Sequence, residues 1–415
     1  MIIEVLVVGD EIVSGVTADT NSGSVARALF ERGHFVSRVT HVGDRAADVA
    51  QAAREAMQRA RVLIVSGGLG PTPDDLTKEA FSALFDDELV LDEATLEEIR
   101  QRFARRGLAM SETNRKQALL PRGGRKIANP LGSAPGVHWA RRDCDVFLLP
   151  GVPPELRRML VDDVVPHVCA LAPAAPPRLA VLRTLGLPES QVAESVRPLQ
   201  AQLAGVRVGF YPSRQGVDVK LLQEGATPEA FDAARAAVRQ ALGVAVYTEE
   251  PGVSLEEVLR RLFVERGWRL AVAESCTGGL LGARLTHVPG SSAFFLGGFV
   301  TYENRTKQEW LGVPPALLEA HGAVSAEVAA AMARGARERA GAQVGLAITG
   351  IAGPTGGTEE KPVGLVYLGL ATADACWTRR LQLGTARALN RELACMLALD
   401  MLRRLALGRP QGEKA

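Results

Sequence analysis

The chain has 415 residues, of which 47% are hydrophobic and 23% are charged, and this composition excludes a disordered chain and predicts two or three globular domains. Its formal net charge of +1 gives no overall attraction to nucleic acid or to an anionic membrane, so small-molecule ligands are favoured. The five cysteines show no zinc-like spacing, no apolar run approaches the roughly 18 residues that span a membrane, and the first residues lack the basic flank of a signal peptide, so we expect a cytoplasmic protein.

Apolar runs alternate with helical patterns through residues 1–170, as they do in repeated βαβ units. The runs VLVV and VLIV are apolar at every position, which indicates strands buried on both faces and hence a largely parallel sheet covered by helices. Such sheets bind ligands at the carboxyl ends of their strands. The predicted strands are 2–10, 34–44, 61–68 and 145–151, and the predicted helices are 19–33, 46–60 and 153–168.

Two linkers divide the rest of the chain. The first, at 171–178, has three prolines among small residues, and the second, at 248–254, contains a Pro-Gly turn. After the second linker, Ser254 and Glu257 predict a capping box at the start of a helix. The segment between the linkers reads as a small α+β unit, with strands at 179–185, 206–212 and 216–223 and helices at 188–203 and 227–242.

A glycine-rich loop with two acidic residues, GGLGPTPDD, follows the predicted strand at 61–68. Its glycines, Gly67, Gly68 and Gly70, would let a phosphate approach the backbone, and Asp74 and Asp75 would suit a hard cation. Paired acids at a helix start are equally typical of residues that complement the helix dipole. Two later loops rich in Gly and Pro, at 129–136 and 149–155, favour a ligand site, and the candidate ligand contacts in the first of them are Asn129 and Ser133.

The stretch AESCTGG places two possible nucleophiles, Ser275 and Cys276, between a predicted strand and a predicted helix. Such a corner directs backbone N–H groups and the positive end of a helix toward a bound anion or a developing oxyanion. Two interpretations stay open from these residues alone. One is a catalytic or anion-binding site, and the other is a capping turn formed by Ser275 and Thr277.

Two further motifs follow in the same segment. TYENRTK offers Tyr302, Asn304 and Lys307, and a desolvated lysine can serve as the base that activates a serine. The alternative is that Lys307 is an ordinary solvated lysine early in a helix. Residues 347–369 run from one buried strand through a loop rich in glycine and proline to another, which is typical of either a ligand-binding loop or a mobile hairpin.

Together AESCTGG, TYENRTK and TGIAGPTGG resemble the nicotinamide mononucleotide deamidase domain of the competence-damage inducible protein A (CinA) family, which places an α/β domain at 252–412. The resemblance implies hydrolysis of a carboxamide without a cofactor, by a dyad of Ser275 and Lys307 beside Tyr302 and Thr349. A family arginine near the last helix corresponds to either Arg387 or Arg391. The other implied substrate contacts are Glu274, Cys276, Thr277, Gly278, Asn304, Gly350 and Gly353.

Residues 1–170 resemble the molybdopterin-binding, MoaB/MogA-like domain of the same family, a three-layer α/β/α fold. The resemblance implies metal-dependent hydrolysis of ADP-ribose, with a diphosphate at the GGLGPT loop and Mg²⁺, Mn²⁺ or Co²⁺ at Asp75 and Asp74. Ser66 stands where the family usually has threonine. Residues 178–250 resemble the family's KH-like α+β domain, but they lack the G-x-x-G loop that clamps nucleic acid. We therefore expect a spacer or dimer-forming role for this segment, and a homodimer.

The favoured function is a bifunctional enzyme of pyridine-nucleotide salvage that acts on nicotinamide mononucleotide and ADP-ribose and contacts neither nucleic acid nor membrane. Two alternatives stay open. One is a nucleotide-binding regulatory protein linked to competence, and the other is a protein that handles molybdopterin.

Overall fold

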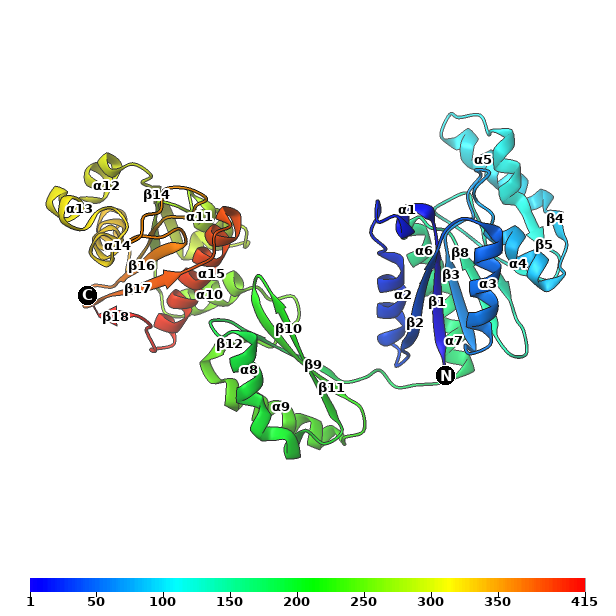
Figure 1. Ribbon diagram of the computed structural model, residues 1–415, viewed down its shortest axis with the longest axis horizontal. Coiled ribbons are helices and arrows are strands. Elements are labelled where there is room, and N and C mark those ends of the chain that lie inside the picture. Colours follow the sequence, from blue (N-terminus) through cyan, green and yellow to red (C-terminus); the bar gives the residue numbers. More distant parts are fainter. Residues whose placement is uncertain (415) are drawn as a thin grey trace. The chain divides into compact units, whose positions relative to one another are not determined.

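The computed structural model describes residues 1–414, and its contacts divide the chain into two compact units (Figure 1). The first unit is Met1–Pro177, and the second begins at Arg178. Among residues 1–414, no helix is both long enough and apolar enough to cross a membrane.

The first unit is a six-stranded sheet between two layers of helices, which confirms the predicted three-layer fold (Figure 1). The strand order is β2-β1-β3-β8-β7-β6, and the first four strands are mutually parallel. The strands are β1 (Ile3–Val8), β2 (Val36–Val42), β3 (Val62–Ser66), β6 (Arg125–Ile127), β7 (Gly136–Trp139) and β8 (Asp145–Leu149). A small separate pair joins β4 (Leu89–Leu91) to β5 (Leu119–Pro121).

Alternation of side chains along the buried strands builds a core on each face of this sheet. In β1, Val5 and Val7 contribute to one hydrophobic cluster, and Leu6 and Val8 contribute to the other. Helices α3 (Ala46–Met57) and α4 (Thr77–Phe85) cover the second face, and α2 (Asn21–Phe30), α6 (Pro153–Met159) and α7 (Val165–Leu171) cover the first. The remaining α-helices of this unit are α1 (Asp10–Val13) and α5 (Glu93–Arg105), and a 3₁₀ helix spans Glu112–Ala118.

The second unit begins with a four-stranded antiparallel sheet, which confirms the small α+β fold. The strand order is β10-β11-β9-β12. Helices α8 and α9 pack on it through a cluster that includes Val192, Phe231 and Val219. The elements are β9 (Leu179–Thr184), α8 (Glu189–Val196), β10 (Val206–Ser213), β11 (Gly216–Gln223), α9 (Pro228–Leu242) and β12 (Val246–Thr248).

The rest of the second unit is a second layered α/β fold, with the strand order β14-β13-β15-β16-β17-β18. Strands β14, β13 and β15 are parallel, and β16 and β17 continue the sheet in antiparallel fashion. The strands are β13 (Leu270–Glu274), β14 (Phe295–Val300), β15 (Val344–Gly350), β16 (Leu365–Ala371), β17 (Cys376–Gln382) and β18 (Glu413–Lys414).

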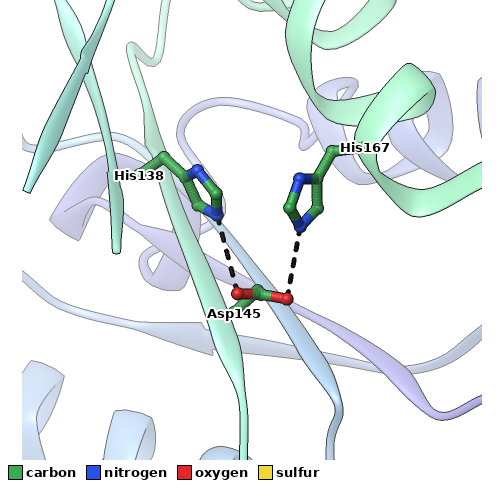
Figure 2. A group of neighbouring side chains, drawn as sticks. All are labelled: His138, Asp145 and His167. Carbon is green, nitrogen blue, oxygen red and sulfur yellow. Dashed lines mark hydrogen bonds and ion pairs between the residues drawn. The ribbon is translucent and has the colours of Figure 1, made fainter. Parts of the chain in front are cut away.

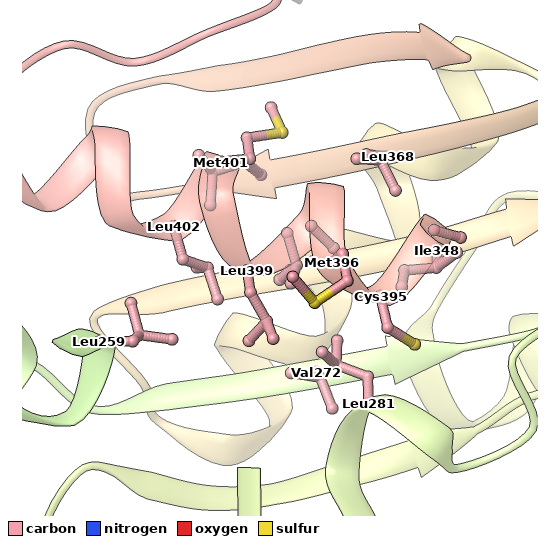
Figure 3. Packing of buried hydrophobic residues seen from close by; sticks show 14 of the residues in the cluster. Leu259, Val272, Leu281, Ile348, Leu368, Cys395, Met396, Leu399, Met401 and Leu402 are labelled. Carbon is pink, nitrogen blue, oxygen red and sulfur yellow. The ribbon is translucent and has the colours of Figure 1, made fainter. Parts of the chain in front are cut away.

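Helices cover both faces of this sheet. Figure 3 shows α15 (Arg387–Ala406) lying over one face of the sheet, with Leu399 and Leu402 among the side chains packed between the helix and the sheet. The same face holds α10 (Leu255–Glu265) and α11 (Leu280–Thr286). The opposite face holds α12 (Asn304–Leu311), α13 (Pro315–His321) and α14 (Ala326–Ala340).

The two parts of the second unit share buried contacts. Leu185 and Tyr247, from the four-stranded part, belong to the hydrophobic cluster under α15. Arg403, which is 2% exposed, donates a hydrogen bond to the carbonyl of Val244 at 2.6 Å and binds the buried Asp400. The linker predicted at 248–254 therefore joins two parts that pack against each other.

Three predicted elements differ in detail from the structure. The helix expected at 188–203 is α-helical only to Val196 and continues as a 3₁₀ helix, Arg197–Leu203, which includes Pro198. The closing helix contains a π-helical turn, Leu160–Val164, just before Pro166. The capping box is half formed, because Ser254 accepts from the N–H of Glu257, whereas the carboxylate of Glu257 binds Arg260.

Candidate active sites

Three motifs that are far apart in the sequence meet at one edge of the second unit's larger sheet. Ser275 follows β13, Tyr302 lies just beyond β14, and Gly350 ends β15. These three strands are parallel neighbours, so their carboxyl ends lie at the same edge. A backbone hydrogen bond from the N–H of Ser275 to the carbonyl of Ile348, 2.9 Å long, ties the first motif to the third.

Lys307 points into this site from the first turns of α12 and is 1% exposed, so its interpretation as a solvated lysine is wrong. Its Nζ lies 3.3 Å from Ser275 Oγ. The same Nζ donates hydrogen bonds to the backbone carbonyls of Thr301 and Tyr302, at 2.8 and 3.2 Å. The lysine is thus fixed by two carbonyl acceptors, and its third direction meets the serine hydroxyl.

Burial lowers the pKa of Lys307, since the charged ammonium is poorly solvated in this position. A neutral amine has two N–H groups and one lone pair. Two carbonyls would accept from the N–H groups, which leaves the lone pair for the Ser275 hydroxyl. This arrangement suits the unprotonated lysine that a general base requires.

The turn that carries Ser275 is held by Glu274, which is 1% exposed. Its carboxylate accepts hydrogen bonds from the backbone N–H groups of Gly279, Leu281 and Gly282, at 3.1, 3.0 and 2.8 Å. Helix α11 has Gly279 at its N-cap with no side-chain cap, so the interpretation of Ser275 as a capping residue is wrong. Glu274 holds the turn through these three bonds, and its expected contact with substrate stays a prediction.

Cys276, the second possible nucleophile, is a buried thiol. It is 6% exposed and belongs to the hydrophobic cluster under α15. Burial raises the pKa of the Cys276 thiol to about 11, so the thiolate is scarce near neutral pH. A buried, protonated thiol is a weak nucleophile, which leaves Ser275 as the better-placed group.

The residues predicted to lie beside the dyad differ in their exposure to solvent and in their hydrogen bonds. Tyr302 is 62% exposed, and its hydroxyl accepts a hydrogen bond from Arg387 Nη2 at 3.3 Å. Thr349 is fully buried and donates to the carbonyl of Ala323 at 2.7 Å, so its hydroxyl is bound to the segment ahead of α14. Asn304 is exposed at the first position of α12.

Both candidate arginines reach the site from the first turns of α15. Arg387 donates to the carbonyl of Gly353 at 2.9 Å and so bridges the 347–369 loop and Tyr302. Arg391 donates to the carbonyl of Thr277 at 2.6 Å, beside Gly278 in the Ser275 turn. The sequence left a choice between these two residues, and the structure brings both to the same edge of the sheet.

Two residues of this site were missed by the sequence analysis. Thr301 is fully buried, and its hydroxyl has no hydrogen-bond partner among the described residues, although its carbonyl holds Lys307. Asn390 donates to the carbonyls of Ala352 and Gly384, which ties the start of the loop after β15 to the segment after β17. Thr301 opens the TYENRTK motif and was detectable there, but only tertiary contacts show what Asn390 does.

A second candidate site is a cavity of about 520 Å³ in the first unit. It lies beyond the carboxyl ends of β1, β3 and β8 and is lined by segments that follow each of them, including Gly9, Gly67 and Gly151. This is the position in which parallel α/β sheets bind ligands. The location agrees with the one expected from the buried strand pattern.

The glycines of the 66–70 loop are required by the backbone. Gly67 and Gly68 have φ angles of 110° and 65°, in the left-handed region that favours glycine. A Cβ atom at Gly68 would overlap Thr77 Oγ1, and one at Gly70 would overlap the carboxylate of Asp75. The loop therefore lines the cavity with bare backbone.

Acidic side chains surround the mouth of this loop. Asp74 and Asp75 both line the cavity, and Asp75 accepts hydrogen bonds from the backbone N–H and the hydroxyl of Thr72. Asp44, which the sequence analysis missed, lines the same cavity. Burial and the negative charges of Asp10, Glu11 and Asp74 raise the pKa of Asp44. Mutual repulsion of this kind is relieved by a bound cation.

The 129–136 loop contributes one of its two expected residues to the cavity. Ser133 lines it, whereas Asn129 holds the loop together through hydrogen bonds to the carbonyl of Ala134 and to Glu155, at 2.8 and 2.7 Å. Asn21 lines the cavity and donates to Ser66 Oγ and to the carbonyl of Gly151. Its Oδ1 atom is buried and lacks a partner among the described residues.

Comparison with known proteins places three family models in order along the chain. Residues 4–169 match the probable molybdopterin binding domain, residues 180–248 the damage-inducible protein CinA KH domain, and residues 253–406 the CinA C-terminal domain. The solved structure of competence/damage inducible protein CihA from Agrobacterium tumefaciens is 43% identical and covers 36% of this chain and 94% of its own, with a TM-score of 0.35.

Similar proteins of the same length are also known. The CinA-like protein of Desulfosudis oleivorans is 43% identical over 416 residues, which cover 98% of this chain and 100% of that protein. The CinA-like protein of Geobacter sulfurreducens is 41% identical over 414 residues, with 98% and 100% coverage. Because the likeness extends over all three matched domains and nearly every residue of both chains, the protein belongs to the CinA family.

Proposed function

We propose that the C-terminal site hydrolyses the carboxamide of nicotinamide mononucleotide to the carboxylate and ammonia. The observation that carries the proposal is the buried Lys307 Nζ, 3.3 Å from Ser275 Oγ. Burial lowers the pKa of Lys307, which favours the neutral amine that can accept the proton of a serine hydroxyl. The substrate is inferred from the family resemblance, and the reaction is inferred from the positions of Ser275 and Lys307.

The reaction proceeds through an acyl-enzyme. Ser275 Oγ attacks the carboxamide carbon while Lys307 accepts the hydroxyl proton. The backbone N–H groups of Cys276 and Thr277 stabilise the negative charge on the carboxamide oxygen. Lys307 then returns the proton to the departing ammonia, and a water molecule, deprotonated by the same lysine, hydrolyses the serine ester to release the carboxylate.

The arginines of α15 serve the phosphate of the same substrate. Arg387 and Arg391 each have a guanidinium group that donates to the loops of the site, to Gly353 and Thr277. Guanidinium groups bind phosphate oxygens with paired hydrogen bonds. A bound mononucleotide would thus have its phosphate toward α15 and its carboxamide toward Ser275.

Ammonia release by the purified full chain tests this proposal. Nicotinamide mononucleotide should give ammonia and the carboxylate in equal amounts, and Ser275→Ala should lower turnover by several orders of magnitude. Binding without turnover by the unaltered protein would instead support a regulatory, nucleotide-binding role.

We also propose that the N-terminal cavity hydrolyses ADP-ribose to AMP and ribose 5-phosphate with a divalent metal ion. The glycine-rich loop offers backbone N–H groups for a diphosphate, and the acids facing it, Asp44, Asp74 and Asp75, fit a hard cation. When bound, the ion would neutralise charge on the diphosphate. The protein's own residues would hold the ion and leave the loop free for the phosphates.

Chelation separates the two proposed activities. Because only the diphosphate reaction uses a metal, a chelator should abolish ADP-ribose hydrolysis and leave ammonia release unchanged. Asp75→Asn should act as the chelator does, with Asp232→Asn, an exposed aspartate of α9, as the matched control. Equal loss of both activities on chelation would contradict the assignment. Tight binding of molybdopterin in place of ADP-ribose would instead favour a protein that handles molybdopterin.

A further inference from the structure

Two histidines and an aspartate meet inside the first unit at a place that no proposed activity uses. His138 lies on β7, Asp145 is the first residue of β8, and His167 lies on α7, and Figure 2 shows both rings turned toward the carboxylate. The cavity with the glycine-rich loop lies beyond the other end of β8, at Pro150 and Gly151. The cluster is therefore at the opposite edge of the sheet.

The three side chains have the separations of a ligand set. His167 Nε2 lies 3.2 Å from one carboxylate oxygen of Asp145, and His138 Nε2 lies 3.7 Å from the other. One ligand atom from each residue lies within 4.8 Å of the other two. Zinc binds imidazole nitrogen and carboxylate oxygen at about 2.0 to 2.2 Å, so its ligand atoms stand roughly 3.3 to 3.6 Å apart. The two histidine–carboxylate separations, 3.2 and 3.7 Å, are close to that spacing.

A second, independent observation is the state of His138. Its residue is 4% exposed, and its Nε2 is buried and makes no hydrogen bond among the described residues. The ring is stacked on Phe147 at 4.1 Å between centroids, which fixes the direction of this nitrogen. A buried polar atom without a partner is costly, and a metal ion at this point would supply the partner.

Near the cluster, Arg61 would compete with a metal ion for the Asp145 carboxylate, and the partly exposed His167 offers the ion a path from solvent. Arg61 Nη1 donates to the same Asp145 oxygen that contacts His167, at 2.8 Å. The side chain of Arg61 is 36% exposed and that of His167 is 27% exposed, so both can move toward solvent. An ion could enter past His167, and Arg61 could then turn outward.

We propose that His138, Asp145 and His167 bind a divalent transition-metal ion of the zinc class. Two imidazoles and one carboxylate favour Zn²⁺ or Fe²⁺ over Mg²⁺ or Ca²⁺, which prefer oxygen ligands. Three protein ligands leave a position for water or an exogenous ligand at the exposed side of His167. The ion would tie β7, β8 and α7 together, just after the π-helical turn Leu160–Val164, a feature that frequently marks functional sites.

Zinc binding to the untagged full chain, freed of metal by a chelator, tests the proposal. Titration with Zn²⁺ against a chromophoric chelator, in excess Mg²⁺ to occupy oxygen-only sites, should show about one tight site per chain. His167→Gln keeps a hydrogen-bonding group but removes the imidazole. Because loss of a supporting residue alone costs about 10- to 100-fold in metal affinity, loss of a direct ligand should cost at least that much.

Two controls make the result specific. His287→Ala removes an exposed histidine of the second unit and should leave zinc affinity unchanged. Asp145→Asn should weaken zinc binding as His167→Gln does, and both variants should lose the visible absorption that Co²⁺ gives in a site with nitrogen ligands. Circular dichroism and the thermal midpoint without metal establish that each variant is folded. Absence of a tight zinc site in the unaltered chain, or equal zinc affinity of folded His167→Gln, would overturn the proposal.

Discussion

At the scale of single residues, Lys307 determines the pH at which the proposed amide hydrolysis operates. Burial lowers the pKa of Lys307, and only the neutral amine accepts the proton of Ser275. Turnover should therefore rise with pH through the lysine's pKa and level off above it, and the lowered pKa brings this rise closer to neutrality. The measurement is the initial rate of ammonia release at saturating substrate across a pH series.

Substitution of Lys307 sharpens this prediction. Lys307→Met removes the base, and turnover should fall by about 10² to 10⁴ with loss of the pH-dependent rise. Lys220→Met, which removes a lysine from β11, is the matched control and should behave like the unaltered protein. A pH profile in Lys307→Met that still rises at the original position would show that another group is the base.

Cys276 tests which of two neighbouring residues is the nucleophile. The thiol is buried and its pKa is raised to about 11, so Cys276→Ala should keep most of the turnover while Ser275→Ala loses it. The lost packing of one small buried group should lower the free energy of unfolding by about 1 kcal/mol. Turnover and thermal midpoint are measured on both variants. Activity in Ser275→Ala together with none in Cys276→Ala would establish a thiol mechanism instead.

At the scale of elements, the glycine-rich loop after β3 depends on space as well as on backbone conformation. Gly68→Ala would place a Cβ atom against Thr77 Oγ1 at a φ of 65°, so the loop must shift and ADP-ribose hydrolysis should be lost. Gly107→Ala has a similar φ of 69° with open space around it, so it should cost only about 1 to 2 kcal/mol of stability. Equal hydrolysis by the two variants would mean that the loop does not contact the substrate.

Elements with a strong periodic pattern were predictable from the sequence. β1 and β3 are apolar at nearly every position because both faces are covered, and this alone indicates a parallel sheet with ligands at its carboxyl ends. Helix interruptions were harder to predict. The π-helical turn at Leu160–Val164 depends on how α6 and α7 pack on the sheet, and the pattern of apolar residues continues through it.

The hydrogen-bond partners of buried polar groups could not be predicted from the sequence, and neither could some residues of the two candidate sites. The binding of Glu274 by three backbone N–H groups of the Ser275 turn was not predicted. Asp44 joins Asp74 only because β2 and β3 end at the same edge. His138, Asp145 and His167 come from three elements without any recognisable spacing, so a metal motif could not be read. Each of these depends on long-range packing.

At the scale of the whole molecule, the N-terminal unit should function alone. This compact unit ends at Pro177, and both hydrophobic clusters of its sheet are formed within residues 1–177. A chain of residues 1–177 should therefore fold and hydrolyse ADP-ribose at the rate of the full protein. The rate and the thermal midpoint are compared with those of the full chain. A folded but inactive piece would show that the second unit contributes to that reaction.

The second unit should tolerate division less well, because its two parts share a core. A chain of residues 178–415 retains Leu185, Tyr247 and the bond from Arg403 to Val244, whereas a chain of residues 252–415 loses all three. Each buried side chain contributes about 1.5 to 3 kcal/mol, and Arg403 would lose a buried partner. Ser275 and Lys307 lie within both pieces, so both should release ammonia, and the shorter one should unfold at a clearly lower temperature.

Restoring 178–251 should raise the thermal midpoint without changing turnover per folded molecule. If the shorter piece is folded but inactive while the longer one is active, the four-stranded part contributes to the site itself and not only to its stability.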